Sequence, residues 1–203
     1  MAAIKTIEEL REIYKMPQGR SVTKQLDRFE THSRRFIELS PFLVMATQAP
    51  NGLGDATPRG EAPGFVHVLD DHRIAIPDRP GNNRLDTMTN IIANPAVSLI
   101  FLLPGVAETL RVNGRGEIRT DADLLDRFTV NDKPPITVLV VTAEEVYFHC
   151  AKALIRARLW EEGAQASERP IPSMSQMINE QTHSTAPVES DADMLARYRK
   201  VLY

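Results

Sequence analysis

The first 40 residues carry apolar side chains at helical spacing and predict two helices. Thr6 and Glu9 have the spacing of a capping box, which places the start of the first helix there. Pro17 and Gly19 then interrupt the pattern. Ser21 is placed to cap the second helix, whose apolar set at roughly helical spacing is Val22, Leu26, Phe29, Phe36 and Ile37.

From residue 41 onward the pattern becomes that of short strands separated by turn residues. The predicted strands cover 42–48, 64–69, 73–77, 96–103, 108–118 and 136–148. Two short helices are expected between them, one at 83–93 with Asn83 as its N-cap and one from Asp121 to about Phe128. Six strands with short helices between them favour a closed β-barrel, because closure removes exposed sheet edges.

These elements predict one domain over residues 1–203 that is mainly β with helices (α+β). Its parts are N-terminal helices at 1–40, a barrel at 41–160 and a C-terminal helical extension at 161–203. The helical stretches towards the end are 149–160, 173–181 and 191–202, and 161–172 is a polar loop.

The composition is that of a globular protein, with 42% hydrophobic and 25% charged residues. A net charge of −3 and a pI near 6.0 argue against a broad nucleic-acid surface, although a local basic pocket for one phosphate remains compatible with them. No apolar run has the length of a membrane span. The start, MAAIKTIEEL, lacks the apolar region of a signal peptide, and the single cysteine, Cys150, cannot form an internal disulfide. We therefore expect a cytoplasmic protein.

Several common catalytic and metal-binding motifs are missing from the sequence. It contains no P-loop, no glycine-rich dinucleotide fingerprint and no nucleophile elbow. The five histidines include no HxxxH pair, so no metal site is predicted. Cys150 is expected to be a packed or half-buried thiol, as free cysteines usually are. No catalytic acid, base or nucleophile is assigned.

The most informative stretch is PDRPGNNR, residues 77–84, which follows a predicted strand and opens a predicted helix. It offers two guanidinium groups, from Arg79 and Arg84, and two side-chain amides, from Asn82 and Asn83. Free N–H groups at a helix N-terminus favour anions, and arginine binds two phosphate oxygens at once. The stretch indicates a phosphate-binding turn, although the same residue types also occur in an ordinary solvated turn.

Two other stretches offer polar groups beside permissive glycines. Arg59 lies in TPRGEAPG, where Gly60 lets the backbone approach a ligand; the alternative is a surface arginine. In RVNG, Arg111 and Asn113 share one strand face, either as ligand contacts or as the solvent face of an antiparallel strand.

Taken in order, these segments resemble the pyridoxamine 5′-phosphate oxidase-like family of FMN-binding split barrels. FLVMATQ followed by TPRGEAPGFVHVLDD is similar to the family's opening hairpins. IAIPDRPGNNRLDTMTNIIANPAVSLIFLLPG resembles its next strand, phosphate-binding turn, helix and following strand, and ETLRVNGRGEI resembles the strand after that. RPGNNRLDT and LRVNGRG resemble a subgroup of uncharacterised proteins expected to depend on FMN.

The resemblance implies an FMN-dependent oxidoreductase that acts on a small molecule and forms a homodimer with FMN at the subunit interface. It implies no membrane and no nucleic-acid partner. The FMN phosphate is expected near Arg59 and the turn Asn82-Asn83-Arg84, and the isoalloxazine ring along the strand through Ile76, Pro77 and Asp78. The remaining candidates for cofactor contacts are Arg79, Asn113, Lys152 and Arg156.

Other functions stay open on the sequence. The main alternative is a non-catalytic flavin-binding or stress-response protein. Haem would need an axial ligand such as His67 or His149, and pyridoxal phosphate would need Lys152; the phosphate turn favours FMN over both. The oxidase's substrate-binding Arg and His motif has no convincing match near Arg156, so the resemblance leaves the substrate unassigned.

Overall fold

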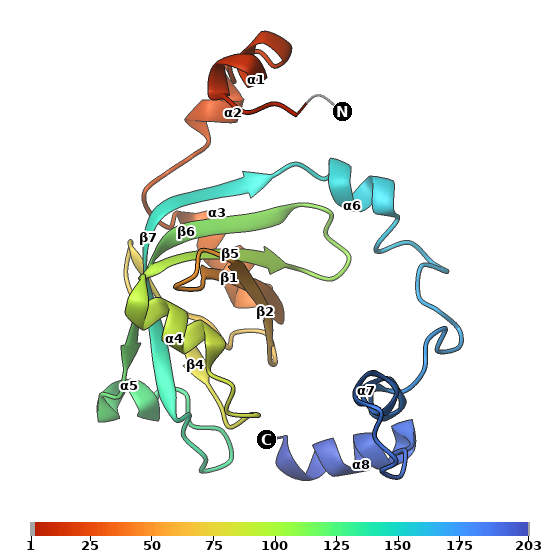
Figure 1. The fold of residues 1–203 in the computed structure, drawn as a ribbon. Helices are drawn as coiled ribbons and strands as arrows, with labels where there is room; N and C mark the ends of the chain where they lie inside the picture. The colour runs from red at the N-terminus through yellow and green to blue at the C-terminus, as the bar shows by residue number, and fades with distance from the viewer. Residues whose placement is uncertain (1–2, 203) are drawn as a thin grey trace.

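The computed structural model describes residues 3–202, and its centre is one seven-stranded sheet (Figure 1). The strands are β1 (Phe42–Gln48), β2 (Gly54–Gly60), β3 (His67–Val68), β4 (Arg73–Asp78), β5 (Ala96–Leu102), β6 (Thr109–Arg119) and β7 (Thr137–His149). They lie in the order β2-β1-β5-β6-β7-β4-β3, and every neighbouring pair is antiparallel. The predicted strands are therefore all present, and β2 is an additional one.

The sheet curls but does not close through backbone hydrogen bonds within residues 3–202, so the prediction of a closed barrel is wrong. β2 and β3 form its two edges. Pro58 has no N–H to donate, which suits β2 to an edge, and β3 is only two residues long. Side chains join the two ends instead, because Arg59 of β2 pairs with Asp78 of β4 at 2.6 Å. The fold is a split barrel, mainly β with helices, as predicted.

The core fills the concave side of the sheet. β1 shows how the sequence builds it, since Leu43, Met45 and Thr47 are buried while the residues between them are half-buried. The largest fully buried side chains on other elements are Ile37, Ile74, Ile76, Leu99, Phe101, Leu110 and Leu139. Each side chain of this size stabilises the fold by about 1.5–3 kcal/mol when buried.

Three helices precede the sheet: α1 (Ile7–Ile13), α2 (Arg20–Thr23) and α3 (Thr31–Leu39). The capping box of Thr6 and Glu9 is confirmed at the start of α1. The prediction of one continuous second helix is wrong, because Glu30 caps α3 by accepting the N–H groups of His32 and Ser33. Phe29, between α2 and α3, is buried in the core instead.

The later helices are α4 (Asp86–Ala93), α5 (Ala122–Asp126), α6 (Lys152–Ala157), α7 (Met174–Thr182) and α8 (Asp191–Val201). From α6 onward the chain forms an arm, here defined as residues 151–202, that arches away from the barrel (Figure 1). Trp160 ties the arm to the barrel by donating its indole N–H to the carbonyl of Val106 at 2.9 Å. Among residues 3–202, no helix combines the length and the apolar character needed to cross a membrane.

Candidate functional site

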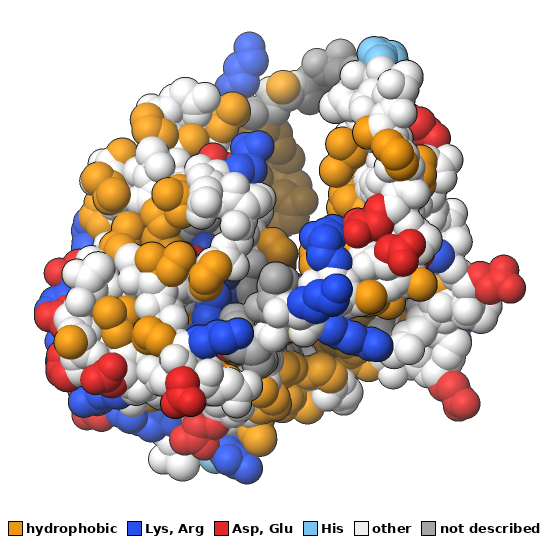
Figure 2. Space-filling model, turned by 90° about the horizontal axis from the view of Figure 1, so that it is seen from below, with side chains coloured by type: hydrophobic (Ala, Val, Ile, Leu, Met, Phe, Trp, Pro, Cys, Tyr) orange, Lys and Arg blue, Asp and Glu red, His pale blue; other side chains and the backbone are white. Residues whose placement is uncertain are grey.

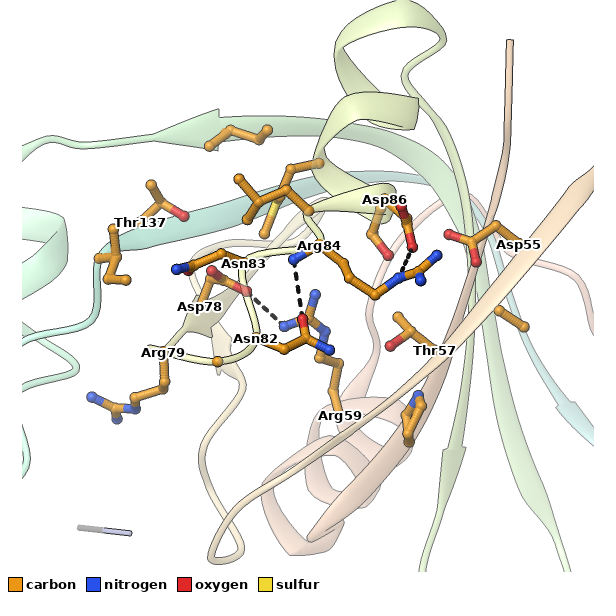
Figure 3. A pocket seen from close by; sticks show the side chains of 18 residues that line it. Asp55, Thr57, Arg59, Asp78, Arg79, Asn82, Asn83, Arg84, Asp86 and Thr137 are labelled. Carbon is orange, nitrogen blue, oxygen red and sulfur yellow. Dashed lines mark hydrogen bonds and ion pairs between the residues drawn. The ribbon is translucent and has the colours of Figure 1, made fainter. Parts of the chain in front are cut away.

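A cleft opens between β2, the end of β4 and the turn that leads into α4 (Figure 3). Its volume of about 530 Å³ lies within the range of about 300–1,000 Å³ usual for small-molecule sites. Ile118, Ile136 and Thr137 line it from β6 and from the start of β7. Most of the other side chains around it are polar: Asp55, Thr57, Arg59, Asp78, Arg79, Asn82, Asn83, Arg84, Asp86 and Thr87.

The cleft brings together six of the predicted site residues, namely Arg59, Asp78, Arg79, Asn82, Asn83 and Arg84. Ile76 and Pro77 do not line it, because their side chains are buried in β4. β3 pairs only with Ile74 and Ala75 of β4, so it leaves the edge of β4 at 76–78 uncovered. A ligand can therefore reach the backbone of this segment without touching the side chain of Ile76.

The other three candidates lie elsewhere. Asn113 accepts hydrogen bonds from Ser98 and Arg111 and donates to Glu145, in a second hollow between β1, β5 and β6. Lys152 and Arg156 belong to α6 and are exposed. The single-chain structure does not bring these three residues to the cleft.

Arg59 reaches the cleft because alternation along β2 turns Asp55, Thr57 and Arg59 to the same side. Its Nη1 donates to Asp78 Oδ1 at 2.6 Å, and the pair is mostly buried. Its Nε is fully buried and has no hydrogen-bond partner among residues 3–202. A buried N–H without a partner is costly, so this atom indicates a missing acceptor in the cleft.

Arg79 is engaged by a carboxylate that lies just beyond β2. Its Nε and Nη2 donate to the two oxygens of Glu61 at 3.0 and 3.1 Å, and both side chains are largely buried. A two-point guanidinium–carboxylate bond of this kind fixes both groups. Arg79 therefore braces the turn against β2 and is a weaker candidate for a ligand contact than Arg59.

The turn itself is longer than predicted, because α4 begins at Asp86 and not at residue 83. Asn83 and Leu85 have φ values of 58° and 56°, and this left-handed backbone cannot continue into a helix. The side-chain oxygen of Asn82 accepts the N–H of Arg84 at 3.1 Å, which stabilises the turn. The prediction that Asn83 caps α4 is therefore wrong.

Arg84 projects across the mouth of the cleft, where Asp86 is its partner (Figure 3). Its Nε donates to Asp86 Oδ2 at 2.8 Å, and both side chains are well exposed. The hydrogen bond and the charge of Asp86 raise the pKa of Arg84, so the guanidinium stays charged at physiological pH. Asp86 also lies in the first turn of α4, where it already meets the positive end of the helix dipole.

Asp55, Thr57 and Asp86 also line the cleft, although the sequence did not single them out. The charges around the cleft balance, since three arginines face three aspartates: Arg59, Arg79 and Arg84, and Asp55, Asp78 and Asp86. Polar residues at every second position of GDATPRG were the signal that could have found Asp55 and Thr57. That signal is weak, because the same alternation occurs on solvent-facing strands.

The histidines and the cysteine lie outside the cleft. His67 stacks on Phe128 with ring centroids 4.1 Å apart, and burial followed by the charge of Arg127 lowers its pKa. Burial, Lys24 and Arg111 lower the pKa of His149 in the same way. Cys150 is exposed, because it follows the end of β7 at the start of the arm; the expectation of a packed thiol is wrong. Residues 3–202 contain no cluster of three acidic, histidine or cysteine side chains that could hold a metal ion.

Solved structures with a similar fold include HupZ from Group A Streptococcus, at 17% identity over 58% of this chain and 92% of that one, with a TM-score of 0.48. A putative pyridoxamine 5′-phosphate oxidase from Lactobacillus delbrueckii is 19% identical over 61% of this chain and 98% of that one, with a TM-score of 0.49. An FMN-binding protein from Syntrophomonas wolfei is 15% identical over 58% and 88%, with a TM-score of 0.44. No curated protein matches the chain.

The family model described as pyridoxamine 5′-phosphate oxidase matches residues 29–150. The matched segment runs from the entry to α3 to the end of β7 and includes every strand and every residue that lines the cleft. The chain belongs to the pyridoxamine 5′-phosphate oxidase family.

Proposed function

We propose that this protein binds FMN in the cleft and acts as an FMN-dependent oxidoreductase on a small substrate. The observation that carries the proposal is the buried, unpartnered Nε of Arg59, which lies in the same cleft as the Asn82–Arg84 turn. A phosphate oxygen would satisfy this donor, and the family supplies precedent for the flavin.

The residues of the cleft fit a phosphomonoester attached to a longer body. Arg59, the amides of Asn82 and Asn83, and Arg84 would hold the phosphate, with Asp86 giving up its bond to Arg84. The uncovered edge of β4 at 76–78 would lie beside the flavin ring. Bound FMN supplies the redox chemistry, and the protein positions it and its substrate.

A second subunit completes the proposal. The cleft is open on one side, and a tricyclic ring needs more cover than one chain provides. A homodimer with FMN at the interface would supply that cover, and it would offer Asn113, Lys152 and Arg156 a route to the partner's cofactor. The alternating burial of β5, with Val97, Leu99 and Phe101 in the core, makes that strand a poor dimer surface. The reduced state of a lone cysteine supports a cytoplasmic location.

The test of the cofactor is reconstitution of the purified protein. FMN should bind at about one per subunit and give the visible absorption bands of a bound flavin. FAD should bind less tightly, because the site is built for a terminal monoester. Tight binding of haem without any binding of flavin would overturn the proposal.

Turnover distinguishes an oxidoreductase from a protein that only binds flavin. The FMN-loaded protein should consume NADH or NADPH, followed at the nicotinamide absorption band, when a panel of small acceptors is supplied. Stoichiometric FMN binding with no consumption of either donor under any acceptor would favour a non-catalytic flavin-binding protein.

A further inference from the structure

One face of β2 carries three different polar groups in a row. Asp55 presents a carboxylate, Thr57 a hydroxyl and Arg59 a guanidinium, all towards the cleft (Figure 3). Strand geometry places the Cα atoms of Asp55 and Arg59 about 13 Å apart. A single phosphate cannot contact both ends of this row, so a ligand that fills the cleft meets an anionic end and a cationic end.

Asp55 is held in place from behind by two donors. Asn90 of α4 donates from Nδ2 to Asp55 Oδ2 at 3.1 Å, and Thr47 of β1 donates from Oγ1 to the same oxygen at 3.3 Å. Asn90 is only 4% exposed, and it also donates to Thr47 Oγ1 at 3.0 Å. The network fixes the carboxylate before any ligand arrives.

The other oxygen of Asp55 is unused. Asp55 Oδ1 accepts no hydrogen bond from any of residues 3–202, whereas the other two aspartates of the cleft, Asp78 and Asp86, are each paired with an arginine. A carboxylate oxygen in a cleft that excludes part of its water needs a donor. The donor has to come from the ligand.

We infer that Asp55 is a specificity-determining residue that accepts a hydrogen bond from a hydroxyl or N–H group of the bound ligand, and so orients that ligand along β2. This inference rests on the proposed function. A dianionic phosphate is repelled by Asp55 and Asp86 and attracted by Arg59, so the phosphate lies at the Arg59 end. The donor-bearing part of the same molecule then lies at Asp55.

The variant that tests this is Asp55→Asn. Its side-chain oxygen can still accept from Asn90 and Thr47, so the melting temperature should stay close to that of the wild type. Its amide nitrogen then takes the place of Oδ1 and presents donors where the ligand needs an acceptor. Asp123→Asn is the matched control, because it makes the same change on α5, outside the cleft.

Three probes separate the parts of the ligand: FMN, riboflavin, which lacks the phosphate, and lumiflavin, which lacks the phosphate and the hydroxyl-bearing chain. Asp55→Asn should weaken riboflavin about tenfold, the loss expected for a hydrogen bond to a charged group. FMN should lose no more than riboflavin, because removing the charge of Asp55 also lessens repulsion of the phosphate. Asp123→Asn should leave all three affinities unchanged.

Lumiflavin identifies the donor. If Asp55→Asn leaves lumiflavin unaffected, the donor is a hydroxyl of the chain; if lumiflavin weakens as riboflavin does, the donor is the ring N–H. Both results support the inference. It is overturned if riboflavin binds Asp55→Asn within about twofold of the wild type, or if Asp123→Asn causes an equal loss. A wild type that binds no flavin overturns the proposed function as well, which a change confined to Asp55→Asn cannot do.

Discussion

The arginines of the cleft differ in how easily they can leave their carboxylate partners. Arg79 is 9% exposed and bound at two points to Glu61, so releasing it would bury two uncompensated charges. Arg84 is 75% exposed, and an exposed ion pair contributes little to stability. A phosphate can therefore recruit Arg84 from Asp86 at small cost, whereas Arg79 is committed to the fold.

Arg84→Ala should accordingly weaken FMN about tenfold and leave riboflavin nearly unchanged, because only FMN carries the phosphate. Arg84→Lys should recover part of the loss, since an ammonium cannot bind two oxygens in one plane. Fluorescence titration of both ligands measures the effect. Arg115→Ala is the matched control, because Arg115 forms a similarly exposed pair with Glu144 at 2.9 Å outside the cleft. Equal losses for FMN and riboflavin would mean that Arg84 supports the fold instead.

His67 predicts a pH dependence of stability. Burial lowers its pKa below the ordinary value of about 6.5, so the unfolded chain takes up this proton first as pH falls. The contribution to stability is complete above pH of about 6.5 and is lost as pH falls from there through the folded pKa. His67→Phe keeps the stack on Phe128 and should flatten the acid side of the profile, measured by urea denaturation from pH 8 to 5. An unchanged slope would exclude His67 as the cause.

At the scale of elements, hydrophobic patterning predicted the strands that build the core and missed β2. Residues 42–48, 96–103 and 136–148 alternate apolar and polar side chains because one face is buried, and they became β1, β5 and β7. β2 reads GDATPRG and has no apolar face, because its inner side lines the cleft. A strand at a ligand site thus loses the pattern by which strands are recognised.

The site shows the same limit. The turn at 77–84 was recognisable from its arginines and amides, which need only local sequence. Asp55 was not, because its role depends on Asn90 and Thr47, which lie 35 and 43 residues apart from their partners in the network. Closure of the barrel was also unpredictable, since it depends on whether β2 can donate to a strand that is far away in the sequence.

Gly114 marks a close approach between β6 and β7. It lies at the irregularity in pairing after Asn113, and a Cβ there would overlap the carbonyl oxygen of Thr142. Gly114→Ala should therefore destabilise the protein by about 1–3 kcal/mol, the usual range for overpacking. Gly81→Ala, where a Cβ meets nothing within 4 Å, is the control and should change the free energy of unfolding by less than about 0.5 kcal/mol. Chemical denaturation of both variants decides; similar values would contradict this account of the bulge.

At the scale of the whole molecule, the arm is the part whose stability the single chain does not explain. α7 and α8 have 9 and 11 residues, lengths that are marginal for isolated helices in water. Salt bridges from Arg169 to Asp191 and from Arg197 to Glu189 hold them together, yet Ile178 and Leu195 are about half exposed. Figure 2 shows hydrophobic side chains on both sides of the hollow between the arm and the barrel. Such surfaces are usually covered by a partner.

The proposed homodimer gives the arm that partner, and its mass is the direct test. Light scattering on the FMN-loaded protein should give about twice 22.7 kDa. Leu195→Asp should shift the equilibrium towards monomer, because it places a charge on the exposed apolar face of α8. Ile13→Asp, at a similarly exposed position on α1, should leave the dimer intact. If the flavin lies between subunits, FMN should dissociate as the dimer does. A 22.7 kDa species that keeps its FMN would show that one chain suffices for the site.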